Sequence, residues 1–188
     1  MLAHNRNGYG MTDTVYSDFD SPVGTLGIAR RGGAITSLRF ASNGGQPSPL
    51  GTGWVRDDHA FDDLREQLAC YFAGRLESFD LELAPEGTAF QQRVWSALRN
   101  IPFGQTLSYG ALAGQLGRPG AARAVGTANG ANPIAVLIPC HRVIAADGSL
   151  AGFAGGVEIK RRLLDLERKH AGLFASQGPD RAPLPSAE

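Results

Sequence analysis

One apolar run constrains this chain more than any other stretch. It covers residues 134–144, Ile-Ala-Val-Leu-Ile-Pro-Cys-His-Arg-Val-Ile, and its only basic side chains are the adjacent His141 and Arg142. A run of this length that is rich in β-branched residues predicts a buried segment made of short strands or extended chain. The fold therefore has to place Cys140 and its basic neighbours in or beside a core.

Cys140 and His141 are the candidate reactive residues of this run. A cysteine in apolar surroundings is ordinarily an inert small hydrophobe, and a histidine beside it is then a structural residue. A cationic or hydrogen-bonding neighbour, however, lowers the pKa of a thiol, and the resulting thiolate is the nucleophilic form. The pair alone leaves both interpretations open, and the surrounding motifs must decide between them.

The composition indicates a globular chain that can build its own core, because 43% of its 188 residues are hydrophobic and 19% are charged. Cys70 and Cys140 are too few for a disulfide framework or a four-cysteine zinc site, although one bridge between them stays open. The four histidines show no metal-binding spacing. No run approaches the roughly 18 apolar residues of a membrane span, and residues 1–10 lack the features of a secretion signal. We expect a reduced, cytoplasmic protein without a metal, cofactor or membrane anchor.

The net charge is zero, but the charges are unevenly distributed. Residues 1–89 carry 7 arginines and 12 acidic residues, whereas residues 90–172 carry 10 basic and 4 acidic residues. This asymmetry suggests an acidic module joined to a basic one that could meet a polyanion.

Residues 13–86 have the pattern of a small α/β domain with an antiparallel sheet. Alternating side chains predict strands that begin near Thr14, Thr25 and Ala34, and apolar spacing predicts a helix over residues 60–72 that ends at Gly74. Residues 79–83 are expected to form a last strand. Residues 1–12 are expected to be a disordered leader and residues 42–53 a loop. We find no catalytic pattern in this half.

Residues 88–171 predict a mostly helical domain with a helix-turn-helix, similar to a winged helix. Thr88 and Ser108 are candidate N-caps for helices over residues 89–99 and 109–116. Further helices are expected over residues 121–130 and 158–170, and residues 172–188 are expected to be a disordered tail.

The predicted helix over residues 121–130 is unusual because almost all its side chains are small. Gly126 and Gly130 each reduce helix propensity by about 1 kcal/mol, and Arg123 is its one long side chain. Such a helix suits close packing against another helix or close approach to DNA. Because it lacks the polar side chains of a major-groove reader, we expect any DNA contact to rely on shape or the minor groove.

Several motifs in this half occur in a diagnostic order. An Arg-Ala-Val-Gly segment at residues 123–126 precedes Asn132-Pro133, then Pro-Cys-His-Arg-Val at 139–143, a Gly-rich loop at 152–156 and a basic-Leu-Leu helix. Over residues 90–167 this order and spacing resembles the O6-alkylguanine-DNA alkyltransferase family, and the N-terminal half resembles it in outline. The resemblance implies direct-reversal DNA repair. The alkyl group of O6-alkylguanine, with O4-alkylthymine as a further candidate substrate, passes irreversibly to a cysteine, once per protein molecule and without a cofactor.

The resemblance also implies roles for individual residues. Cys140 is then the acceptor thiolate, His141 takes the thiol proton through a water, and Glu167 holds and charge-balances the histidine. Tyr109 donates a proton or hydrogen bond to the departing base. Asn132 orders the turn that leads into the active-site segment.

The implied partner is double-stranded DNA that contains alkylated guanine, bound by a monomer with the option of cooperative assembly on DNA and, in a prokaryote, a nucleoid association. Arg123 is implied to enter the base stack where the damaged nucleotide flips out. The other candidate DNA contacts are Ala122, Thr127, Ala128 and Arg142. The candidate pocket residues are Val143, Phe153, Ala154 and Gly155. Many relatives have tyrosine at the position of Phe153 and some have serine at that of Ala154, so we expect activity to survive with a changed rate or substrate range.

Three other functions compete with this interpretation. A lesion-binding sensor without chemistry would lack the acceptor Cys140. A cysteine hydrolase would need contact between Cys140 and His141, which neighbours in an extended chain do not make. A helix-turn-helix repressor would need a polar recognition helix, which this chain does not offer.

Overall fold

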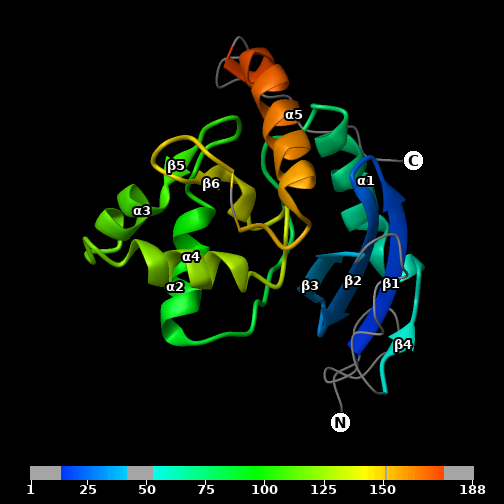
Figure 1. The fold of residues 1–188 in the computed structure, drawn as a ribbon. Helices are drawn as coiled ribbons and strands as arrows, with labels where there is room; N and C mark the ends of the chain where they lie inside the picture. Colours follow the sequence, from blue (N-terminus) through cyan, green and yellow to red (C-terminus); the bar gives the residue numbers. More distant parts are fainter. Residues whose placement is uncertain (1–13, 42–52, 151, 176–188) are drawn as a thin grey trace.

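The computed structural model describes residues 14–41, 53–150 and 152–175. The predicted leader, most of the predicted loop after residue 41 and residues 176–188 of the predicted tail lie outside the described residues. In Figure 1, α5 (Val157–Ala175) stands between a sheet with one helix and a group of shorter helices. Among the described residues, no helix combines the length and apolar character that crossing a membrane requires.

A four-stranded sheet forms the first half, with its strands in the order β3-β2-β1-β4. Its strands are β1 (Thr14–Ser21), β2 (Gly24–Arg31), β3 (Ala34–Phe40) and β4 (Val55–Arg56). The antiparallel pairing of β1 with β2 and of β2 with β3 confirms the three predicted strands. Gly32 and Gly33 both have positive φ, which a two-residue hairpin turn of this kind requires. The parallel pairing of β4 with β1 was not predicted, because two residues are too few to show an alternating pattern.

The prediction of a strand over residues 79–83 is wrong, because only Leu83 forms a bridge, to Ile35 in β3. The reason is that two segments share this edge of β3. Ile35 donates its amide to Glu82 O and accepts from Ala84 N, both at 2.8 Å, whereas Leu38 pairs with residues 133–135 farther along the strand. Each segment therefore has room for only a short contact.

Helix α1 (Asp62–Phe72) continues a 3-10 turn, His59–Phe61, and confirms the predicted helix. Its buried residues Leu64, Leu68 and Tyr71 follow the spacing of one helical face. Figure 1 shows this helix lying along the sheet. The helix ends at Phe72 with Ala73 as its C-cap, and Gly74 follows with a φ of 66°.

The second half contains α2 (Ala89–Leu98), β5 (Leu107–Ser108), α3 (Tyr109–Gln115), α4 (Ala122–Gly130) and β6 (Val143–Ile144) before α5. Thr88 and Ser108 cap α2 and α3 as predicted, the first in a reciprocal pair of bonds with Gln91. The parallel pair β5–β6 was not predicted. The expectation of a tail from residue 172 is wrong for residues 172–175, because α5 continues to Ala175.

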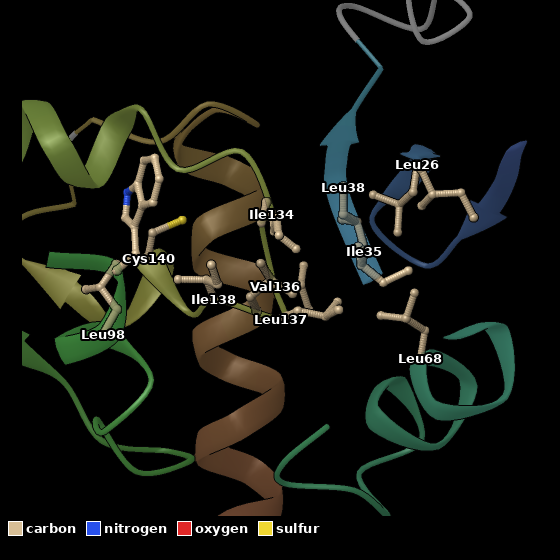
Figure 2. Packing of buried hydrophobic residues seen from close by; sticks show 14 of the residues in the cluster. Leu26, Ile35, Leu38, Leu68, Leu98, Ile134, Val136, Leu137, Ile138 and Cys140 are labelled. Atoms are coloured by element: carbon tan, nitrogen blue, oxygen red, sulfur yellow. The ribbon is translucent and has the colours of Figure 1, made fainter. Parts of the chain in front are cut away.

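The apolar run 134–138 is buried where the two halves meet, as its composition predicts. In Figure 2, Ile134, Val136 and Leu137 lie between Ile138 on one side and Ile35 and Leu38 on the other. The prediction of an extended run is wrong in detail. Residues 134–138 form a turn closed by the amide of Ile138 donating to Ile134 O at 3.0 Å, and residues Cys140–Arg142 form a 3-10 turn.

Candidate active site

Cys140 begins the 3-10 turn and is 5% exposed. Two asparagines hold the backbone of Cys140 and of the segment before it. Asn129 Nδ2 donates to Cys140 O at 3.2 Å, and Asn132 Nδ2 donates to Ile138 O at 2.8 Å. Asn132 Oδ1 also accepts from Ile134 N at 3.0 Å, so its side chain closes the turn just before Cys140.

Burial sets the protonation state of Cys140 in the resting protein. Burial raises the pKa of the Cys140 thiol, and the hydrogen bond from Asn132 and the charge of Lys160 offset this only in part. The resting thiol is therefore neutral and must lose its proton as it reacts.

His141 follows in the same turn and is completely buried. Its Nε2 lies 2.8 Å from Glu167 Oε1 in α5. Because an ionised carboxylate can only accept, Nε2 carries the hydrogen, and Nδ1 is left with the free lone pair. Nδ1 is buried and has no hydrogen-bond partner among the described residues. Burial lowers the pKa of His141, so the imidazole is neutral and able to accept a proton at Nδ1.

Glu167 is buried and accepts from donors on both carboxylate oxygens. Arg142 donates through Nε to Oε2 and through Nη2 to Oε1, each at 2.9 Å. Tyr71 OH donates to Oε1 at 2.7 Å, and Gly104 N donates to Oε2 at 3.0 Å. Burial alone would raise the pKa of Glu167, but the hydrogen bond from His141 and the contacts with Arg142 outweigh it and hold that pKa well below its usual range. Glu167 therefore stays an anion that orients His141.

The prediction that Arg142 contacts DNA is wrong. The side chain is 7% exposed, and besides its bonds to Glu167 it donates from Nη1 to Ile101 O at 2.6 Å. The prediction for Ala128 is wrong as well, since this residue is 3% exposed and its carbonyl accepts from Trp95 Nε1. Both residues face the interior because they pack between helices of the second half.

The other predicted residues lie around this centre or on the outer face of α4. Tyr109 begins α3 and is half-buried, and this burial raises its pKa. Arg123 and Thr127, four residues apart on α4, are exposed, whereas Ala122 is half-buried. Of the predicted pocket residues, Val143 is buried, Phe153 and Gly155 are half-buried and Ala154 is exposed.

Three contributing residues were missed at the level of sequence. Asn129 and Tyr71 come from buried faces of α4 and α1, and the unbroken helical pattern gave no sign of their polar contacts. Lys160 is buried, donates from Nζ to Val143 O at 2.7 Å and lies over the ring of Tyr109. Its signal was present in α5, because Lys160 shares a face with Leu163 and Glu167 at helical spacing. This spacing could therefore have predicted that Lys160 lies on the same side of the helix as Glu167.

We expect acid to destabilise the protein through this buried cluster. The pKa of Glu167 is lowered by folding from an ordinary value of 4.5, and that of His141 from 6.5. Below these values the unfolded chain binds more protons than the folded one. The free energy of unfolding therefore falls below pH 6.5, as His141 of the unfolded chain is protonated, and falls further below pH 4.5, where Glu167 adds its effect. The contribution of each group is lost once the pH has fallen through its folded-state pKa. Each unbalanced proton contributes about 1.4 kcal/mol per pH unit. Urea unfolding from pH 7.5 to 4 measures this, and a flat profile contradicts it.

Among the described residues, no group of three or more histidine, cysteine, aspartate or glutamate side chains is arranged to hold a metal ion. The site is instead built from a buried thiol, a neutral imidazole and a carboxylate, next to α4, a helix of small residues with one exposed face. This combination places the chain among proteins that pair cysteine chemistry with a helix-turn-helix.

Comparison with known families identifies the class. Residues 14–85 match the family model of the 6-O-methylguanine DNA methyltransferase ribonuclease-like domain, and residues 89–169 match that of the DNA-binding domain of the same family. The chain belongs to the 6-O-methylguanine DNA methyltransferase family, as the motif order predicts.

Individual relatives cover most of the chain. The methylated-DNA–protein-cysteine methyltransferase of Mycobacterium tuberculosis H37Rv is 53% identical over 156 residues, which span 83% of this chain and 93% of the relative. That of Methanosarcina acetivorans is 47% identical over 152 residues, 81% of this chain and 97% of the relative. The crystal structure of Mycobacterium tuberculosis OGT in complex with DNA superposes with a TM-score of 0.77 at 51% identity, covering 83% of this chain and 94% of that one.

Proposed function

We propose that this protein repairs DNA by transferring the alkyl group of O6-alkylguanine in duplex DNA to the sulfur of Cys140. The observation that carries this proposal is the buried free thiol of Cys140 next in sequence to the hydrogen-bonded pair His141–Glu167, in a chain of the methyltransferase family. The relatives named as methylated-DNA–protein-cysteine methyltransferases support the same activity.

The reaction follows from the protonation states of the site. The thiol proton passes to His141 Nδ1 through a bridging water, and Glu167 balances the imidazolium that forms. Sγ then attacks the alkyl carbon, so that the S–C bond forms as the C–O6 bond breaks and its electron pair leaves with guanine. Tyr109 donates toward the departing base, and the proton taken from the thiol ends on guanine. The product is a thioether, so each molecule reacts once.

Binding of the substrate is assigned to the outer face of α4. The small side chains of this face let the helix backbone approach DNA closely, and Arg123 is long enough to fill the space of an extruded nucleotide. The wall of the substrate pocket is assigned to Val143 and residues 152–156. Because every residue of the site comes from one chain, a monomer is sufficient for the reaction.

The direct test is the intact mass of the protein after incubation with a duplex that contains one O6-methylguanine. We expect a gain of one methylene mass per molecule, and peptide mapping places it on Cys140. A duplex with unmodified guanine is the control. Tight binding of the lesion without any mass gain would contradict the proposal and favour a damage sensor.

Replacing Arg123 with alanine separates nucleotide extrusion from chemistry. We expect the transfer rate in duplex DNA to fall by about tenfold or more, because extrusion then loses the group that fills the stack. Reaction with free O6-benzylguanine should stay within about twofold, since the free base needs no extrusion. Arg168→Ala, which removes an exposed arginine of α5 outside the face assigned to DNA, is the control. Equal losses with both substrates would remove the extrusion role of Arg123.

A further inference from the structure

Phe40, the last residue of β3, reaches from the first half of the molecule to the Gly-rich loop beside the active site. Its ring packs against that of Phe153, with centroids 5.5 Å apart and planes tilted by 57°. Both rings are half-buried. The sheet therefore has a direct side-chain contact with the loop that leads into α5.

Backbone hydrogen bonds fix β3 relative to the segment that carries Cys140. Leu38 N donates to Pro133 O, and Ala135 N donates to Leu38 O, both at 2.9 Å. Figure 2 shows Leu38 and Ile134 on the facing sides of these two segments. Because residues two apart on a strand share a face, Phe40 lies on the same side of β3 as Leu38. Its position is thus tied to the active-site segment.

Gly155 leaves no space between itself and this ring. A methyl group at Gly155 would lie 2.7 Å from Phe40 Cδ2 and 3.1 Å from Phe153 Cε1, closer than atoms pack. Gly155 is absent from the glycines with positive φ, so its lack of a side chain serves close approach and not backbone conformation. The loop backbone at Gly155 therefore packs closely against both rings.

Space remains beside this contact into which the loop could withdraw. A pocket of about 350 Å³ lies between β3, the end of α4 and the loop, and its lining includes Phe40, Asn132 and Ala154. The ring of Phe40 borders this pocket and supports the loop at its edge. Loss of the ring would enlarge the pocket and remove the support.

We propose that Phe40 positions residues 152–156 and thereby limits the size of the alkyl group that the site accepts. The inference rests on the proposed function, in which this loop is a wall of the substrate pocket. A smaller side chain at position 40 lets the loop move away from the site. Larger alkyl groups then fit, while methyl transfer slows because the wall no longer holds the base in place.

A double-mutant cycle tests this contact. Single-turnover rates are measured with duplexes that carry one O6-methylguanine or one O6-benzylguanine, for Phe40→Ala, Gly155→Ala and the double variant. We expect Gly155→Ala to slow methyl transfer by about tenfold or more alone, and by less than about twofold in the Phe40→Ala background, because the clash partner is gone. Phe40→Ala should also raise the ratio of benzyl to methyl rates by about fivefold.

The controls separate this contact from general destabilisation. Phe19→Ala removes another half-buried ring of the same sheet, which faces Arg65, and should leave the rate ratio unchanged. If Phe40→Ala does not fold, Phe40→Leu replaces it in the same cycle. Equal slowing by Gly155→Ala in both backgrounds, or an unchanged ratio, overturns the inference alone. A wild-type protein that gains no alkyl mass from either duplex overturns the proposed function, and this inference with it.

Discussion

Cys140→Ser should abolish alkyl transfer while binding of lesion-containing DNA stays within about threefold of wild type. A serine hydroxyl has nearly the size of the thiol but is a far weaker nucleophile, and His141 cannot generate an alkoxide from it at neutral pH. The exposed face of α4 that is assigned to DNA is separate from the buried thiol, so binding is retained. Intact mass after reaction measures transfer, and fluorescence anisotropy measures binding.

Cys70 supplies the matched control for this experiment. It is the other free cysteine, lies on α1 in the first half and is half-buried. Cys70→Ser should accept one alkyl group per molecule at the wild-type rate. Transfer that survives in Cys140→Ser, or that is lost in Cys70→Ser, refutes the assignment of the acceptor.

Glu167→Gln should reduce both the rate and the stability. The amide keeps the shape of the carboxylate but not its charge, which leaves the buried guanidinium of Arg142 without a counter-charge. Removing one partner of a buried ion pair costs about 3 kcal/mol in the free energy of unfolding. The amide also no longer selects the tautomer of His141 or balances its positive form, so we expect transfer to slow by about 100-fold or more.

Single-turnover rates and urea unfolding measure the two effects separately. Glu158→Gln, an exposed position of the same helix with pairs to Arg161 and Arg162, is the control. Exposed ion pairs contribute at most about 1 kcal/mol to the free energy of unfolding. This variant should therefore stay folded and react at the wild-type rate. An unchanged rate in Glu167→Gln would restrict Glu167 to a structural role.

Local signals in the sequence predicted most of the helices and the main strands. Thr88 and Ser108 cap helices, and Gly74 follows the end of one, through interactions with residues only a few positions away. Their effects can therefore be predicted without tertiary structure. The strands of two residues were missed for the opposite reason, since they exist only through their partners. The strand expected over residues 79–83 failed because residues 133–135 take the remaining edge of β3.

The residues of the candidate site also fall into those that the sequence predicted and those that only the structure revealed. The motifs around Cys140 predicted the family and proposed the roles of His141 and Glu167, but the sequence gave no reason to connect Tyr71 to that glutamate. This bond joins residues in two different halves, and only the packing of α1 near α5 creates it.

By itself, the sequence determined the periodic elements, the burial of the run around Cys140 and the family, because these depend on local pattern and composition. Only the tertiary structure decided where Arg142 points and which protonation states the site holds. Arg142 turns inward because a carboxylate 25 positions away in the chain lies beside it. The thiol of Cys140 stays neutral because burial removes the water that would stabilise a thiolate, and the extent of burial is set by the whole fold.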